Sequence, residues 1–128
     1  MFNTRQDTHI IPFTEDMGVF YSAADLIVSR AGALALSEMA LLGKAMVLIP
    51  LPHSAGNHQT INAQTFSNGG GAVLVPQTSL ASGSLEQTVL ELIQNSKKIA
   101  HMEANSRKNG TPYATEQITT IIMEIAKS

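Results

Sequence analysis

The segment from Asp25 to Gly43 constrains the fold most strongly, because an apolar run, a small-residue turn and a helical pattern follow one another there. The run at 25–28 predicts a buried strand, and the helical pattern after the turn ends at Gly43. Small residues in the turn let the backbone come close to a ligand, while free N–H groups and the positive end of the helix dipole favour phosphate groups. A strand, a turn and a helix with one glycine are common, so this pattern alone leaves the ligand open.

Apolar strands alternate with helical patterns along the chain, and this alternation predicts a parallel α/β sheet. The apolar residues 45–49 are continuous, which is typical of a strand buried on both faces of such a sheet. Strands are predicted at 9–13, 26–29, 44–50 and 72–75, and helices at 16–24, 33–42 and 58–68. Because 128 residues suffice for one domain with a core, residues 1–128 are interpreted as a single domain.

After residue 83 the pattern changes to three consecutive helices. Ser84 and Gln87 fit a capping box that opens the first of them. A second helix is predicted from about 97 to 107 with Gly110 beyond its end, and a third begins at 111–112. These helices are interpreted as packing on the sheet only; the apolar positions at helical spacing in the first are Leu85, Val89, Leu92 and Ile93.

Composition narrows the classes of partner. The formal charge is −2, and between residues 25 and 94 only Arg30 and Lys44 are basic, so no basic stripe is present to follow a nucleic acid. The chain has no cysteine, which excludes disulfides and thiolate metal sites, and His53 and His58 have no third ligand nearby in the sequence. We therefore expect no nucleic acid partner, no metal and no cofactor.

The apolar runs are far shorter than the roughly 20 residues that a membrane-spanning helix needs. The polar residues 1–9 do not resemble a signal peptide. The chain is therefore predicted to be cytoplasmic, with contact to a membrane surface left open.

The predicted topology brings two groups of polar residues to the carboxyl edge of the sheet, where open α/β sheets bind ligands. Glu38 falls about one turn into its helix, where a carboxylate could accept hydrogen bonds from a ribose diol. His58, Gln59 and Asn62 follow the next strand and carry imidazole and amide groups suited to sugar hydroxyls. The alternatives are an exposed helix glutamate and a solvated polar turn with a helix cap, and from the loop alone the second of these is favoured.

Two further positions allow two interpretations each. Arg30, beside the turn, either contacts a phosphate or pairs with a nearby carboxylate. Phe13 and Met17 are interpreted as core residues in preference to base-stacking residues.

The motifs taken together resemble a known family of enzymes. In chain order they are Pro-Phe-x-x-Asp-Met at 12–17, Ala-Asp-Leu-Ile-Val-Ser-Arg-Ala-Gly-Ala at 24–33, Ser-Glu at 37–38, Gly-Lys-Ala-Met-Val-Leu-Ile-Pro at 43–50 and Asn-His-Gln-x-x-Asn-Ala at 57–63. This order resembles the C-terminal, donor-binding domain of the MurG-like UDP-N-acetylglucosamine transferases, which are glycosyltransferase family 28 of the GT-B superfamily. The resemblance covers about residues 10 to 125. It implies an incomplete Rossmann-like α/β fold, with about four parallel strands flanked by helices.

The resemblance also implies an activity and a set of site residues. The activity is transfer of N-acetylglucosamine from UDP-GlcNAc to a lipid-linked acceptor in peptidoglycan biosynthesis, with inversion and without a metal. The UDP phosphates would lie on backbone amides of the 32–37 turn, the ribose on Glu38, and the donor sugar on His58 and Gln59, where His58 departs from the family's glutamine pair. No catalytic residue is implied; the substrate-binding residues are Phe13, Thr14 and Met17 on the uracil side, and Gly32, Ala33, Leu34, Ala35, Ser37, Glu38, His58, Gln59 and Asn62.

Relative to that family, the N-terminal domain with its acceptor site and the start of the C-terminal domain are missing. We therefore expect a chain that does not transfer sugar on its own. The strand at 26–29 would lack its usual neighbour, which predicts pairing with the 9–13 strand, with a second copy as a homodimer, or with the missing half or another partner chain. In the full enzyme the acceptor side would lie at the inner face of the plasma membrane. The alternatives are the donor-binding subunit of a two-chain glycosyltransferase and a non-catalytic α/β module that binds a partner chain.

Overall fold

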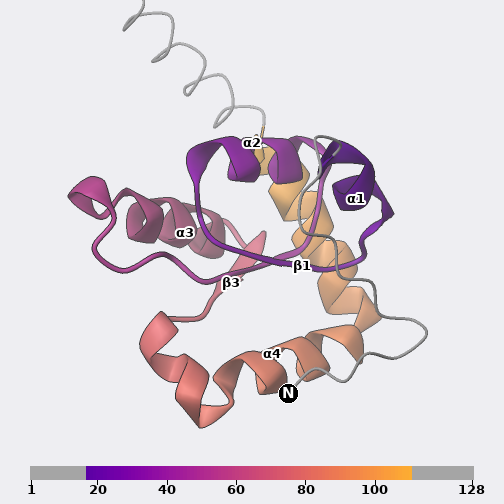
Figure 1. Ribbon diagram of the computed structural model, residues 1–128. Helices are drawn as coiled ribbons and strands as arrows, with labels where there is room; N and C mark the ends of the chain where they lie inside the picture. The colour runs from indigo at the N-terminus through magenta and orange to yellow at the C-terminus, as the bar shows by residue number, and fades with distance from the viewer. Residues whose placement is uncertain (1–16, 111–128) are drawn as a thin grey trace, which may run out of the picture.

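The computed structural model describes residues 17–110, which form a three-stranded parallel sheet with helices on both faces (Figure 1). The order strand–helix–strand–helix–strand confirms the parallel α/β arrangement predicted from the alternation of patterns. The described elements are α1 (Met17–Ala23), β1 (Ile27–Ser29), α2 (Ala33–Leu41), β2 (Met46–Leu48), the 3-10 helix η1 (Ala55–Asn57), α3 (His58–Asn68), β3 (Ala72–Leu74), the 3-10 helix η2 (Gln77–Ser82), α4 (Ser84–Ile93) and a last helix over 96–110.

The strands lie in the order β1-β2-β3, so β2 is central. Met46 of β2 aligns with Ile27 of β1 and with Ala72 of β3. All three residues of β2 are fully buried, which confirms the strand predicted to be covered on both faces. Within residues 17–110 β1 pairs only with β2, and its Val28 side chain is 45% exposed.

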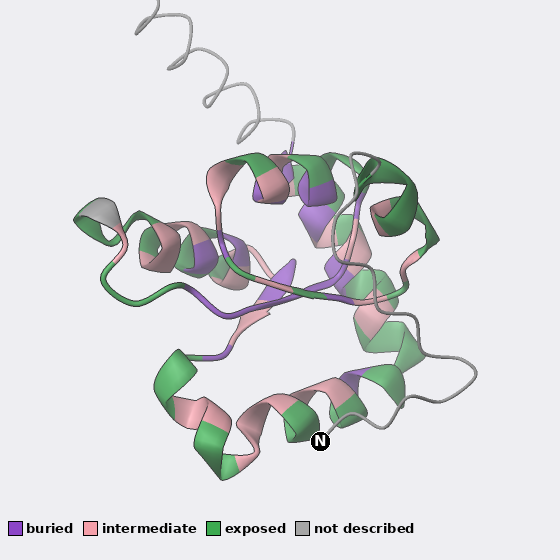
Figure 2. Ribbon diagram, in the orientation of Figure 1, coloured by how far each residue is buried: buried purple, intermediate pink, exposed green. Residues whose placement is uncertain are grey.

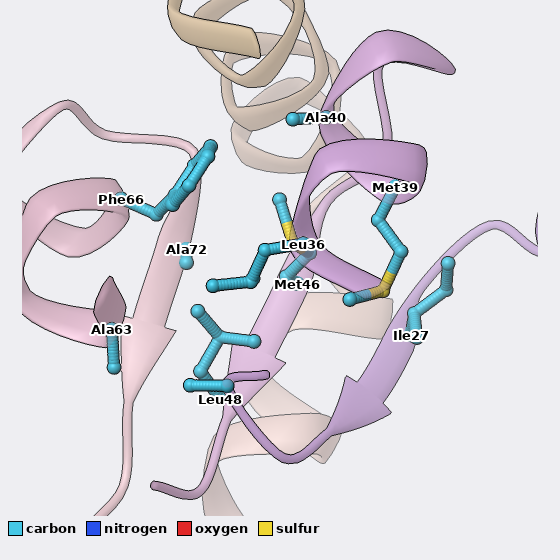
Figure 3. Close-up of a cluster of buried hydrophobic side chains, with 10 residues drawn as sticks. Ile27, Leu36, Met39, Ala40, Met46, Leu48, Ala63, Phe66 and Ala72 are labelled. Atoms are coloured by element: carbon cyan, nitrogen blue, oxygen red, sulfur yellow. The ribbon is translucent and has the colours of Figure 1, made fainter. Parts of the chain in front are cut away.

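Two apolar clusters lie on opposite faces of the sheet, and β2 contributes to both (Figure 2). Met46 and Leu48 belong to the cluster that contains Phe66 of α3 and three buried residues of α2 (Figure 3). Val47 belongs to the other cluster, together with Leu92 of α4. Since side chains alternate across a strand, one short apolar strand anchors a layer of helices on each side.

The last described helix lies against the segments that precede β2 and β3, and small residues allow its close approach. A Cβ added to Gly71 would lie 2.9 Å from the Cα atom of Ser106, and one added to Gly110 would lie 2.7 Å from the backbone of α2. The Asn109 Nδ2 group also donates a hydrogen bond to the carbonyl of Gly69 at 3.1 Å. This helix therefore packs against the amino-terminal edge of the sheet.

The capping box predicted at Ser84 is wrong. The N-cap of α4 is Gly83, which makes no side-chain cap, and the N–H of Gln87 donates to the Gly83 carbonyl at 3.1 Å. The 3-10 helix η2 runs directly into Gly83, whose φ of 80° is a left-handed conformation that glycine adopts readily. The chain therefore turns one residue earlier than predicted, and Ser84 becomes the first residue of the helix.

Other boundaries differ from the prediction as well. The helix predicted to end near 107 continues to Gly110, which packs against α2 where a larger residue would collide. Ile93 was expected at a packing position of α4 but is 56% exposed, whereas Leu92 is buried. The strand predicted at 9–13 and the helix predicted from 111 lie outside the described residues, so the described sheet has three strands.

Candidate functional site

The carboxyl ends of the three parallel strands lie at one edge of the sheet, and α2 and α3 both begin there (Figure 1). β1 ends at Ser29 and is followed by α2 from Ala33, while β2 ends at Leu48 and α3 begins at His58. Ligands of open α/β sheets bind at such an edge. The fold therefore brings the predicted turn and the predicted polar loop to the same edge.

The first turn of α2 presents backbone N–H groups without partners. Its N-cap, Gly32, makes no side-chain cap, and the first intrahelical bond runs from the N–H of Leu36 to the Gly32 carbonyl at 3.0 Å. The N–H groups of residues 32–35 form no hydrogen bond with any other residue in the described part of the chain. Four unpaired donors at the positive end of a helix favour an anion.

The side chain of Leu34 is exposed at this turn, whereas that of Ser37 is hydrogen-bonded within the helix. The Leu34 side chain is 72% exposed on the first turn, so it is available to a ligand seated on the amides. The Ser37 hydroxyl donates to the carbonyl of Ala33 at 2.9 Å within the helix. This bond uses the single Ser37 hydroxyl proton, so the backbone N–H groups are the donors that remain at the start of α2.

Glu38 lies on the second turn of α2, at the position in the helix that the sequence predicted, and it is exposed. Tyr21 of α1 is close to it: burial raises the pKa of the Tyr21 phenol, and the negative charge of Glu38 raises this pKa further. Tyr21 is half-buried against the cluster below α2, so α1 and α2 lie side by side here. The sequence did not indicate this pair, because β1 separates the two helices and no spacing rule relates them.

Gln59 and Asn62 of α3 reach across to the turn that precedes α2. The Gln59 Oε1 atom accepts the N–H of Ala31 at 3.2 Å and the N–H of Leu51 at 2.9 Å. The Asn62 Nδ2 group donates to the carbonyl of Ala31 at 3.1 Å. Two of the three residues predicted to suit sugar hydroxyls therefore join the loop after β1 to the loop after β2 and to α3.

His58 opens α3 from a tightly wound loop. Gly56 and Asn57 both have left-handed φ angles, of 59° and 56°, and the imidazole of His58 lies over Gly56, with Nε2 2.8 Å from where a Cβ on Gly56 would stand. The hydroxyl of Ser54 accepts the N–H of Gln59 at 3.3 Å and so holds the start of the helix. Ser54 was not predicted, although a serine before a helix start is the available signal.

The remaining predicted residues divide into those the structure describes and those it does not. The Arg30 Nη1 group donates to the carbonyl of Ile49 at 3.3 Å, which directly joins the segment after β1 to the segment after β2. Met17, at the start of α1, is 40% exposed, and α1 has no buried residue, so its interpretation as a core residue is wrong. Phe13 and Thr14 lie outside the described residues.

A cavity lies away from this edge of the sheet, and metal-binding clusters and membrane-spanning helices are both lacking in the described segment. A cavity of about 570 Å³, lined in part by Lys97, His101 and Met102, opens beside the last helix, remote from the turn before α2. Residues 17–110 hold no group of three or more His, Cys, Asp or Glu side chains that could bind a metal ion. Of the helices in that segment, none has both the length and the apolarity to cross a membrane.

The three-stranded parallel sheet, flanked by helices and with the uncapped start of α2 at its carboxyl edge, defines a Rossmann-like domain. The family model of the glycosyltransferase family 28 C-terminal domain matches residues 1–118. The chain therefore belongs to glycosyltransferase family 28, in the C-terminal domain of that family.

Curated relatives bear a common name, UDP-N-acetylglucosamine–N-acetylmuramyl-(pentapeptide) pyrophosphoryl-undecaprenol N-acetylglucosamine transferase. The protein from Idiomarina loihiensis is 39% identical over 93% of this chain, and that from Ralstonia nicotianae is 40% identical over 95%. The chain spans about a third of their length, 33% in both cases. The crystal structure of Acinetobacter baumannii MurG superposes with a TM-score of 0.74 at 35% identity, over 91% of this chain and 35% of that one.

Proposed function

We propose that this chain is the UDP-binding part of an inverting N-acetylglucosamine transferase. The observation that carries the proposal is the row of four unpartnered N–H groups at residues 32–35, with Glu38 one turn further along the same helix. The amides suit the diphosphate, and the carboxylate suits the two hydroxyls of a ribose. The relatives are named as N-acetylglucosamine transferases, which supports UDP-GlcNAc as the donor.

The same geometry suggests how the donor is activated. As the bond from the sugar to the diphosphate breaks, negative charge grows on the departing UDP. The backbone N–H groups at the amino-terminal end of α2 are already oriented toward that charge. They therefore stabilise the departing UDP more than they stabilise the intact UDP-sugar. The acceptor that we propose is the lipid-linked pyrophosphoryl-undecaprenol compound in the relatives' names, which would bring the working enzyme to the inner membrane face.

The edge of β1 supports a second proposal, that the chain works with another polypeptide. Among residues 17–110, β1 has a neighbouring strand on one side only, and Val28 is exposed on it. An open apolar edge tends to pair. The partner is either the complementary part of a glycosyltransferase or a second copy of this chain, and a purely partner-binding module without a nucleotide site is the competing function.

A titration of the chain with UDP by calorimetry separates these functions. Saturable binding in the micromolar to low millimolar range is the result expected for a diphosphate held by several charge-assisted hydrogen bonds. AMP and inorganic phosphate serve as controls for nonspecific anion binding. A flat titration at millimolar UDP would favour the partner-binding module.

A further inference from the structure

The backbone of Ala31 is held at both of its polar groups by side chains of one helix. Gln59 accepts the Ala31 N–H at 3.2 Å, and Asn62 donates to the Ala31 carbonyl at 3.1 Å. Gln59 and Asn62 are three positions apart in α3, so their side chains leave the same face of that helix. Ala31 itself is fully buried and immediately precedes Gly32, the N-cap of α2.

These bonds determine which backbone donors face the proposed anion site. The carbonyl of Ala31 and the N–H of Gly32 belong to one planar trans peptide, so they point in opposite directions. When Asn62 holds the carbonyl, the Gly32 N–H is directed away from Asn62. Gln59 occupies the Ala31 N–H, so the free donors begin at Gly32.

The Gln59 side chain, together with Arg30, also fixes the loop that follows β2. The same Oε1 atom of Gln59 accepts the N–H of Leu51 at 2.9 Å, and the guanidinium of Arg30 donates to the Ile49 carbonyl at 3.3 Å. Three side chains therefore cross between the segments that follow β1 and β2. Rigid placement of donors before a ligand arrives lowers the cost of binding it.

We infer that Gln59 and Asn62 are positioning residues of the nucleotide site, which act on the diphosphate through the backbone of Ala31. The inference rests on the proposed function, and it adds a role to the sugar contacts expected from the sequence. The Nε2 group of Gln59 and the Oδ1 group of Asn62 have no hydrogen-bond partner in the described part of the chain, so they stay available to a sugar.

UDP separates the two roles, because it carries the ribose and the diphosphate but lacks the donor sugar. The variants Gln59→Met and Asn62→Leu remove the bonds to Ala31 at nearly constant side-chain volume. Gln64→Met is the matched control, since Gln64 is an exposed residue of the same helix. Calorimetry with UDP and amide hydrogen exchange of the ligand-free proteins are measured on all four chains, and thermal melts verify folding.

We expect Gln59→Met and Asn62→Leu to bind UDP roughly tenfold more weakly than the wild type, while Gln64→Met binds like the wild type. Gln59→Met should also speed exchange of the Ala31 and Leu51 amides. Unchanged UDP affinity in folded Gln59→Met and Asn62→Leu would overturn the inference, and Asn62→Leu decides it alone if Gln59→Met does not fold. If the wild type itself fails to bind UDP, the four chains behave alike, and the proposed function falls together with this inference.

Discussion

Glu38 is the residue whose proposed role is easiest to isolate, because it is exposed on α2. If it binds the ribose, Glu38→Ala should weaken UDP binding by about 1.5–3 kcal/mol, the usual range for hydrogen bonds to a charged group, or roughly tenfold to a hundredfold. Calorimetry with UDP and UMP should show the loss for both, since both carry the ribose. Glu86→Ala, an exposed glutamate in the first turn of α4, is the control. Equal affinity of Glu38→Ala and the wild type would remove Glu38 from the site.

Tyr21 offers a second test at the residue scale, through its titration. Its pKa is raised by burial first and by the charge of Glu38 second, so Glu38→Gln should lower it, and burial should keep it above the ordinary value. The titration is followed by NMR of the Tyr21 ring, with Glu86→Gln as control. A Tyr21 pKa that Glu38→Gln leaves unchanged would show that the two residues are not close in solution.

The sign of the linked stability effect follows from the raised pKa. A folded state that holds the Tyr21 proton more tightly than the unfolded chain keeps its full stability below the unfolded pKa of about 10 and loses stability as the pH rises through the folded value. Tyr21→Phe should flatten the loss above that pH.

At the scale of elements, the docking of helix 96–110 depends on the absence of a side chain at Gly71. A Cβ there would meet the backbone of Ser106 at 2.9 Å, so helix and β3 must move apart. Gly71→Ala should destabilise the chain by about 1–3 kcal/mol, the usual cost of overpacking. Gly18→Ala in α1 is the matched control: nothing lies within 4 Å of its added Cβ, and the change should stabilise by about 0.5–1 kcal/mol. Urea unfolding measures both, and equal stabilities would contradict the close approach.

At the scale of the whole molecule, the donor part alone should not transfer sugar. Transfer needs an acceptor held in line and a base to take its proton, and the proposed role of this chain supplies neither. Incubation with UDP-GlcNAc and a lipid-linked acceptor should give no product above background, with full-length MurG as the positive control. Sugar transfer by the chain without a partner would contradict the proposal that it supplies only the donor-binding part.

The exposed edge of β1 leads to a second prediction at this scale. We expect the chain to self-associate at tens of micromolar, most simply as a twofold dimer, since β1 has one neighbouring strand within residues 17–110. Sedimentation velocity should show the dimer, and Val28→Lys, which places a charge on the exposed edge, should shift it toward monomer. A stable wild-type monomer whose β1 amides exchange freely would show that the edge pairs with nothing.

The sequence by itself determined the elements whose signal is local and strong. The apolar run 45–49 predicts β2, and the strand–turn–helix pattern around Gly32 predicts β1 and α2. The glycines after α2 and α3 mark where these helices end. The structure places these elements within a residue or two of the prediction. The family followed from motifs in a fixed order, and the family model matches residues 1–118.

Only the tertiary structure decided how residues far apart in the chain meet. Glu38 lies beside Tyr21, and Gln59 holds Ala31, because the parallel sheet sets α1, α2 and α3 next to one another, and no periodicity relates positions across a strand. The start of α4 depends on the left-handed turn at its N-cap, Gly83. The extension of the last helix to Gly110 depends on a close contact with α2. Local patterns report which face of an element is apolar, whereas long-range packing decides which polar group each side chain reaches.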